Sequence, residues 1–464
     1  MRTTDRMATS RAFARLAALV CLAWLGSVVI ATADDGELKR RGFLGVRIGP
    51  VAPEIRKTLE LEPGAGLAVM DVVAGSSAEG TFKAGDVVVN LDGQPVQTAM
   101  GFVRQLSKRK AGDVLKIAYI RDGKRADAEL ALKESPRETS DSYDVSYGAV
   151  NSKAGRLRTI IAKPKDKAQG GKRPALMLLQ GIGMFTMEKA TGGFEAYPAI
   201  VEDFAKRGFV VMRVDKPGCG DSEGGPIQDV DFETQLDGFR QALKALKADP
   251  DVDPDKILLF GHSMGGLWAP VLAQEIPVYG IAVYGTAVEP WGDYLIENKR
   301  RQLGLAQAPE AEIDTVIKDE IAGMKLILQD KLSPEQAAAK QPDLENWVRA
   351  TWQDGKYYSG CNYQFFQQLS EIRPEKLWEK FQGHVLAVWG QADFVGPGAD
   401  HKRIAEIVDR AHPGHGKFVA LENSDHGFFE AKTLEDSFQR HGAPAKFNPA
   451  IIAELRKWSE SLKG

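Results

Sequence analysis

The stretch Ile257-Leu258-Leu259-Phe260-Gly261-His262-Ser263-Met264-Gly265-Gly266 decides how most of this 464-residue chain must fold. Its four leading apolar residues are typical of a buried strand, and the glycines around Ser263 indicate a sharp turn into a helix. We expect glycine at 261 and 265 because side chains there would clash in so tight a turn. Backbone strain would lift the Ser263 hydroxyl clear of the sheet, where it can attack a carbonyl carbon.

A serine hydroxyl is a weak nucleophile near neutral pH, so this chemistry requires a base and an acid that orients it. Both residue types follow later in the chain. Asp393 comes just after the apolar run Val385–Trp389, and His426 lies in a loop after the expected strand Lys417–Leu421. Serine, aspartate and histidine in this order, each at the end of a strand, predict a catalytic triad.

An attacked carbonyl develops negative charge on its oxygen, and backbone N–H groups commonly stabilise that oxyanion. Met264, the residue after the serine, is expected to donate one N–H. The second donor is expected just after the apolar strand Pro174–Leu179, where Ile182 is the first choice and Gly181 is the neighbour considered with it. The sequence thus predicts an oxyanion site built from two separate loops.

These motifs resemble the α/β-hydrolase superfamily, in its branch of serine esterases and peptidases, over residues 145–464. The resemblance implies an α/β fold with the α/β-hydrolase sheet. The loop Asp215–Ser222, which follows the expected strand Phe209–Val214, resembles a Gly-rich loop of the same superfamily. We expect this loop to shape the rim of the sheet.

A helical cap insertion is predicted at about 289–380, between the expected strand Tyr279–Tyr284 and the strand that begins at Val385. Helical periodicity places its helices at Pro309–Gln329, Pro334–Lys340, Leu344–Gln353 and Tyr363–Leu369. Eight aromatic residues would either form an apolar wall over Ser263 or simply pack the cap together. They are Trp347, Trp352, Tyr357, Tyr358, Tyr363, Phe365, Phe366 and Trp378.

A separate small unit is expected at residues 42–133, followed by a polar linker at 134–144. Its motifs resemble a PDZ domain of the bacterial periplasmic kind, which implies a small, β-rich α+β fold. The matching segments are Gly42-Phe43-Leu44-Gly45-Val46, Gly75–Ala78 and Gly85–Gly93. The resemblance implies that residues 42–46 bind the C-terminal carboxylate of a protein while the peptide adds a strand beside Val46–Ile48. Alternatively, these are core residues of a domain that serves stability or contact with the hydrolase.

Residues 1–33 read as a cleaved signal peptide. Four arginines precede the apolar run Leu16–Ile30, and Ala31-Thr32-Ala33 forms a small-x-small cleavage site. An uncleaved anchor is the alternative, although a membrane-spanning helix needs roughly 20 apolar residues. We expect an exported protein, periplasmic or secreted, with no stable membrane span after cleavage. The remaining 431 residues are too long for one core, which indicates at least two domains.

The mature chain is mildly acidic. Removal of residues 1–33 takes away four arginines and one aspartate, so the net charge of −3 becomes −6. Basic residues are interspersed with acidic ones, which argues against nucleic acid as a partner. Cys219 and Cys361 remain, and they would either pair in an oxidising compartment or stay as free thiols.

The function expected first is hydrolysis of a carboxylic ester through an acyl-enzyme, with no cofactor and no metal. The substrate would be a small-molecule acyl ester or a peptide. A serine peptidase or aminopeptidase is the second hypothesis, because a domain that gathers C-termini would suit it. The third is a non-catalytic binding protein in which the PDZ domain acts and the hydrolase is a scaffold.

Overall fold

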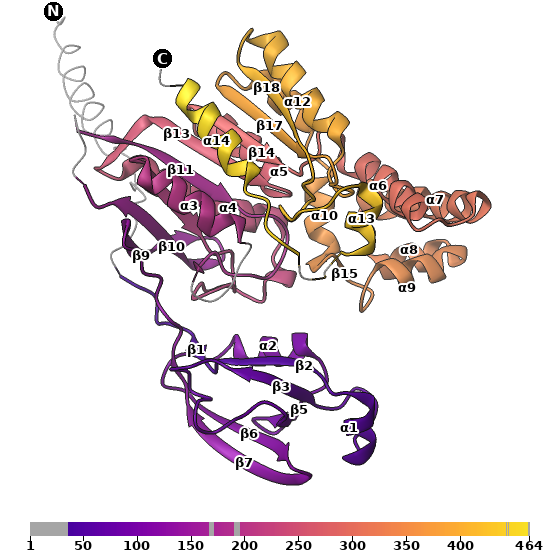
Figure 1. The fold of residues 1–464 in the computed structure, drawn as a ribbon. Coiled ribbons are helices and arrows are strands. Elements are labelled where there is room, and N and C mark those ends of the chain that lie inside the picture. Colours follow the sequence, from indigo (N-terminus) through magenta and orange to yellow (C-terminus); the bar gives the residue numbers. More distant parts are fainter. Residues whose placement is uncertain (1–35, 167–170, 190–194, 442, 444, 463–464) are drawn as a thin grey trace, which may run out of the picture.

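The computed structural model describes residues 36–166, 171–189, 195–441, 443 and 445–462 (Figure 1). The predicted signal peptide at 1–33 lies outside the described residues. None of the helices in these described ranges is long and apolar enough to cross a membrane.

The C-terminal part is built on one eight-stranded sheet with the order β18-β17-β14-β13-β11-β12-β10-β9. The antiparallel strand β10 pairs with both β9 and β12, and the remaining neighbours are parallel. All six strands predicted here are present, with ends shifted by a few residues. The bounds are β9 Tyr143–Ser152, β10 Gly155–Pro164, β11 Arg173–Leu179, β12 Val210–Val214, β13 Val252–His262, β14 Gly280–Tyr284, β17 His384–Gly390 and β18 Gly416–Leu421. Parallel strands end at the same edge, so the loops that carry the predicted site residues meet there.

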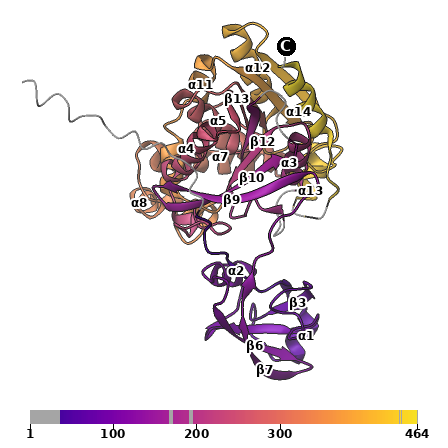
Figure 2. The ribbon, with the colours of Figure 1, turned by 90° about the vertical axis from the view of Figure 1, so that its left-hand side faces the viewer.

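Helices cover both faces of this sheet (Figures 1 and 2). One apolar cluster packs α4, α5 and α12 on one face, and a second packs α3 and α14 on the other. Coverage on both faces explains why the central strands are continuous apolar runs, and it confirms the predicted fold class. The bounds are α3 Ala196–Lys206, α4 Phe232–Ala248, α5 Gly265–Glu275, α12 Gly398–Ala411, α13 Leu434–Gln439 and α14 Ala450–Ser461.

A mostly helical insertion separates β14 from β17. The four predicted helices are present, and α7 ends earlier because its last turn widens into a π-helix. The helices α6 and α11 were not predicted. Only Tyr294, Leu295 and Asn298 of α6 are buried, so its apolar periodicity is weak. The elements are α6 Trp291–Leu305, α7 Glu310–Met324, the π-helix Lys325–Gln329, α8 Pro334–Lys340, the 3₁₀-helix Pro342–Leu344, α9 Glu345–Thr351, β15 Tyr357–Tyr358, β16 Cys361–Asn362, α10 Tyr363–Leu369 and α11 Pro374–Lys380.

The N-terminal part is a separate body with its own apolar core (Figures 1 and 2). Its sheet has the order β2-β3-β4-β6-β7, with the short strand β5 paired to β4. The strand β2 therefore lies at an edge, beside α2. The bounds are β2 Val46–Pro50, α1 Pro53–Thr58, β3 Leu67–Val72, β4 Val87–Leu91, β5 Gln94–Pro95, α2 Ala99–Leu106, β6 Val114–Arg121 and β7 Lys124–Ala131. β7 was not predicted, because charged residues occupy much of it.

Residues 135–142 of the segment predicted as a polar linker, 134–144, form neither helix nor strand, and the segment contacts the hydrolase part. Its first residue belongs to β8 (Lys133–Glu134), which pairs with β1 (Gly42–Phe43). Glu138 is buried and forms an ion pair with the buried Arg213 at 2.8 Å. The charged residues of this segment indicated a linker. The buried ion pair of Glu138 attaches the segment to the large sheet.

A second attachment point lies just before the N-terminal part. The Arg40 side chain is 3% exposed and contacts Asp221 at 2.5 Å and Glu188 at 3.0 Å. Arg158 of β10 contacts the same two carboxylates. Because buried charges are stable only when paired, this network ties the connecting segment to the rim of the large sheet.

Candidate active site

Ser263 lies at the turn between β13 and α5, as the motif predicts. Its φ angle is +55°, in the left-handed region that residues other than glycine rarely adopt. A Cβ at Gly261 would lie 2.5 Å from the carbonyl oxygen of Gly265, and one at Gly265 would collide with the carbonyl oxygen of Leu179. Only glycine therefore fits at these two positions, which agrees with the reason given for them from the sequence.

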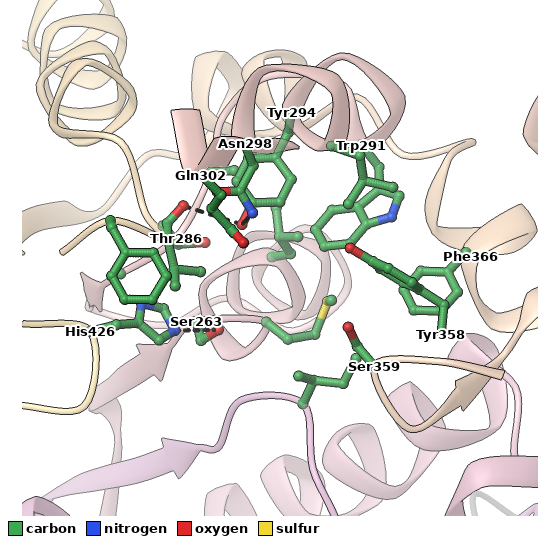
Figure 3. A pocket seen from close by; sticks show the side chains of 18 of the residues that line it. Ser263, Thr286, Trp291, Tyr294, Asn298, Gln302, Tyr358, Ser359, Phe366 and His426 are labelled. Atoms are coloured by element: carbon green, nitrogen blue, oxygen red, sulfur yellow. Dashed lines mark hydrogen bonds between the residues drawn. The ribbon is translucent and has the colours of Figure 1, made fainter. Parts of the chain in front are cut away.

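The three predicted triad residues lie together at the carboxyl edge of the sheet. His426 Nε2 lies 3.1 Å from Ser263 Oγ (Figure 3), and His426 Nδ1 lies 2.9 Å from Asp393 Oδ2. Asp393 Oδ1 accepts the N–H groups of Val395 and Gly396, each at 2.8 Å. These bonds hold the carboxylate in place, so that it can orient the imidazole toward the serine.

The charges of this pair reinforce each other. Burial alone would raise the pKa of Asp393, but the charge and hydrogen bond of His426 outweigh it, and the net pKa is lowered. Burial alone would lower the pKa of His426, but the Asp393 carboxylate outweighs it and the net pKa is raised. Asp393 is thus an anion that stabilises an imidazolium, as a general base requires.

His262, the residue before the serine, was not predicted to take part in the site. Its Nε2 donates to the carbonyl oxygen of His426 at 2.9 Å, and its Nδ1 lies 2.7 Å from the Tyr197 hydroxyl. Burial, with the nearby charge of His426, lowers the pKa of His262 to about 3. A neutral His262 therefore connects the turn to the histidine loop. Its position inside the serine motif was the only sequence signal.

The three predicted oxyanion donors differ in whether their N–H groups already have a hydrogen-bond acceptor. The N–H groups of Ile182 and Met264 have no acceptor among the described residues, and both residues line the same cavity as Ser263. The Gly181 N–H instead bonds to the Tyr197 hydroxyl. Unpaired N–H groups are rare in folded proteins, so those of Ile182 and Met264 mark a place for an acceptor.

A cavity of about 530 Å³ opens beside Ser263 (Figure 3). Part of its wall comes from α6, through Trp291, Tyr294 and Asn298, and another part from Tyr358 and Phe366. None of the described residues that line it is an aspartate, glutamate, lysine or arginine. The cavity is therefore suited to an uncharged, partly aromatic or aliphatic group.

The predicted aromatic wall is corrected in part. Of the eight aromatic residues, Tyr358 and Phe366 line the cavity, and the other six do not: Trp347, Trp352, Tyr357, Tyr363, Phe365 and Trp378. Trp352 and Trp378 are fully buried, because large apolar rings gain most by packing inside the insertion. Both cysteines are buried and free, so Cys219 and Cys361 do not form the disulfide considered above.

The residues predicted to bind a peptide carboxylate surround the start of β2. A Cβ at Gly45 would collide with Ser76, and the φ angle of Gly45 is +76°. The N–H groups of Leu44 and Gly45 have no acceptor among the described residues. The Leu44 side chain is 3% exposed and belongs to the apolar core of the N-terminal part. Gly42 and Phe43 lie in β1, and Val46 begins the edge strand β2.

Comparison with known proteins agrees with this division. Residues 42–132 match the PDZ domain family, and the chain is 31% identical over 128 residues to a probable periplasmic serine endoprotease, DegP-like, of Pseudomonas fluorescens. That match covers 27% of each chain, and a match to the periplasmic serine endoprotease DegP of Escherichia coli covers 25% of this chain and 24% of the relative at 31% identity. The chain spans about a quarter of the length of these two curated relatives.

Solved structures similar to this chain include Est1E of Butyrivibrio proteoclasticus, with a TM-score of 0.42 and 15% identity over 69% of this chain and 99% of that one. Another is a hyperthermophilic esterase of Pyrobaculum calidifontis, with a TM-score of 0.41 and 16% identity over 71% and 87% of the two chains. Residues 192–430, just over half of the chain, match the family described as serine aminopeptidase, S33. The chain therefore belongs to this family of α/β-fold serine hydrolases, and it carries a PDZ domain ahead of the hydrolase.

Proposed function

We propose that this protein hydrolyses carboxylic esters with an uncharged acyl group, with Ser263 as nucleophile, His426 as general base and Asp393 as the residue that orients His426. The observation that carries the proposal is a cavity whose described lining holds no aspartate, glutamate, lysine or arginine, beside a serine that already contacts its base. No cofactor or metal is needed for this chemistry.

The first half-reaction forms an acyl-enzyme. Ser263 Oγ attacks the ester carbon while its proton moves to His426 Nε2, and the carbonyl electron pair moves onto the oxygen. The N–H groups of Ile182 and Met264 stabilise that oxyanion. When the oxyanion collapses, the bond to the alcohol oxygen breaks and His426 returns the proton to the leaving alcohol. Water then repeats the sequence on the acyl-enzyme and releases the acid.

The cavity favours an ester over a substrate with a free amino terminus. An aminopeptidase must recognise the α-ammonium group of its substrate, and a buried ammonium requires a carboxylate partner. The described residues of the cavity wall include no carboxylate. Aromatic and aliphatic side chains there would instead bury an acyl chain, at a gain of roughly 0.8 kcal/mol for each methylene group.

A serine peptidase is the second candidate, because the two parts of the protein share a cavity. Val103 of α2 and Met184, two residues after Ile182, line the same space of about 500 Å³. Val103 is 56% exposed, which is unusual for a large apolar side chain. A peptide held along β2 and α2 would thus lie near the loop that carries Ile182. We further propose that the PDZ domain binds protein C-termini through the unpaired N–H groups of Leu44 and Gly45.

Export to the periplasm is part of the proposal. It rests on the signal-peptide pattern at 1–33 and on the PDZ-matching relatives, whose names describe them as periplasmic.

The deciding experiment measures turnover of p-nitrophenyl esters of graded acyl length beside anilides of dipeptides to tetrapeptides. Both panels use the mature protein and its Ser263→Ala variant. We expect the mature protein to hydrolyse esters and Ser263→Ala to have lost this activity. The dependence of the rate on acyl length then shows how long an acyl chain the cavity accepts. Anilide turnover without ester turnover would establish the peptidase instead. Turnover of neither panel would favour a binding protein that acts through its PDZ domain.

A further inference from the structure

Lys216 is a buried lysine that the mechanism above does not use. It lies in the loop after β12, within the Gly-rich segment 215–222, and its side chain is 2% exposed. Among the described residues no carboxylate forms an ion pair with it; the titratable groups that act on it are the thiols of Cys219 and Cys361. Burial raises the pKa of each thiol to about 11, so both are neutral near neutral pH. Burial lowers the pKa of Lys216, and no carboxylate among the described residues offsets the cost of a buried ammonium group. A cation kept at this place therefore calls for an explanation.

Within the part of the chain that the structure describes, the ammonium group has one hydrogen bond, and it leads to the predicted oxyanion site. Lys216 Nζ donates to the carbonyl oxygen of Gly181 at 2.9 Å. That oxygen belongs to the peptide unit whose N–H is the N–H of Ile182, the predicted oxyanion donor. The ring centroids of Phe185 and Trp268 lie 5.9 and 5.8 Å from Nζ, close enough for both rings to attract the positive charge. The ammonium group therefore has a fixed place behind the peptide.

The geometry of a peptide unit turns this contact into control of the oxyanion donor. A trans peptide is planar, and its C=O and N–H point in opposite directions. A bond that fixes the carbonyl direction therefore fixes the N–H direction as well. A positive charge next to the carbonyl oxygen also polarises the peptide: electron density shifts from the nitrogen toward the oxygen. The N–H group then becomes a stronger hydrogen-bond donor.

We propose that Lys216 is a positioning residue for ester hydrolysis: its ammonium group aims and polarises the Gly181–Ile182 peptide so that the Ile182 N–H stabilises the oxyanion. This inference rests on the proposed function, because it assigns a role within that reaction. It also gives a reason for the buried charge. The negative charge that Lys216 compensates exists only in the transition state and the tetrahedral intermediate.

The test compares Lys216→Met, which removes the donor and the charge, with Lys216→Arg, which keeps a cation. Lys163→Met is the matched control. Lys163 lies on β10, which pairs with β12. It forms ion pairs with Asp249 and Asp251, which precede β13 at the end opposite Ser263. Each variant of the full mature chain is assayed for kcat and KM on the best p-nitrophenyl ester and for its thermal unfolding.

A second readout does not depend on ester turnover. A fluorophosphonate probe reacts when Ser263 Oγ bonds to phosphorus, fluoride leaves and the serine proton passes to His426. The phosphoryl oxygen develops charge in the same oxyanion site. We expect Lys216→Met to lower both kcat and the phosphonylation rate by about 10- to 100-fold with KM changed by less than about two-fold. Lys216→Arg should recover most of both rates, and Lys163→Met should match the unaltered protein.

Several results would overturn the proposal. An unchanged phosphonylation rate in Lys216→Met would do so. Equal losses of kcat in Lys216→Met and Lys216→Arg, together with a raised KM, would also do so, because a disturbance of packing has that effect. If Lys216→Met does not fold, Lys216→Gln, which keeps a donor without the charge, replaces it and must lose rate. Normal phosphonylation of the unaltered protein without ester turnover would overturn the proposed function alone, because the phosphonylation ratios still decide the role of Lys216. No phosphonylation at all would overturn both.

Discussion

Replacing Asp393 with asparagine should disable the base while leaving the fold intact. Asp393 Oδ1 accepts two backbone N–H groups, from Val395 and Gly396. An amide NH₂ group cannot accept them, so the amide oxygen of the new side chain must keep that place. The NH₂ group then replaces Oδ2, which lies 2.9 Å from His426 Nδ1. An NH₂ group only donates, so the imidazole would carry its proton on Nε2.

The size of the loss follows from this tautomer. With a proton on Nε2, His426 faces Ser263 with a donor and cannot take the serine proton. We expect kcat to fall about 10⁴-fold, which corresponds to roughly 5.5 kcal/mol of lost transition-state stabilisation. Both backbone hydrogen bonds survive, so the free energy of unfolding should change by less than about 1 kcal/mol.

The assay is single-turnover and steady-state hydrolysis of the best p-nitrophenyl ester, together with urea unfolding. Asp425→Asn is the matched control, because Asp425 adjoins His426 and its Oδ1 likewise accepts two backbone N–H groups, from Gly427 and Phe429. Its carboxylate acts on His426 only through its charge, so kcat should stay within about ten-fold of the unaltered protein. A kcat for Asp393→Asn that also stays within about ten-fold would refute the tautomer argument.

Three further predictions follow from the site and its supports. The kcat/KM for esters requires neutral His426, whose pKa Asp393 raises above 6.5, so activity should rise with pH through a midpoint above 6.5 in a pH-rate profile. A midpoint below 6.5 would contradict this coupling. Gly265→Ala should lower the free energy of unfolding by about 3 kcal/mol or displace the turn at Ser263, because the new Cβ would collide with the Leu179 carbonyl oxygen. Thermal unfolding and ester turnover measure the two effects. Unchanged values of both would refute the prediction. Arg40→Met should cost about 3–5 kcal/mol in urea unfolding, because it leaves buried carboxylates short of a partner, whereas Arg137→Met, at an exposed ion pair, should cost less than about 1 kcal/mol.

Much of the site could be predicted because its signals are local. The turn at Ser263 needs glycines at fixed offsets, and steric clashes within a few residues enforce them. Asp393 and His426 follow strands that are apolar enough to recognise in the sequence. In a parallel sheet such strands end at one edge, so chain order and strand ends together bring the three residues into one place.

The misses share a different cause. Helix α6 supplies Trp291 to the cavity wall, yet few of its residues are buried, so its periodicity is weak. Glu138 looked like part of a polar linker and is instead buried against Arg213. The sequence could not distinguish aromatic residues of the insertion that line the cavity from those in the core, because both environments favour large apolar rings.

The sequence by itself determined the strand-turn-helix at Ser263, the chain order of nucleophile, acid and base, and the presence of a second domain ahead of the hydrolase. These features depend on residues that are neighbours in the chain, where backbone sterics and apolar periodicity act directly. Only the tertiary structure decided that His262 supports the histidine loop, that Ile182 rather than Gly181 has an unpaired N–H, and that Lys216 holds the peptide between them. Such contacts join segments that are far apart in sequence, and packing alone sets the distances between them.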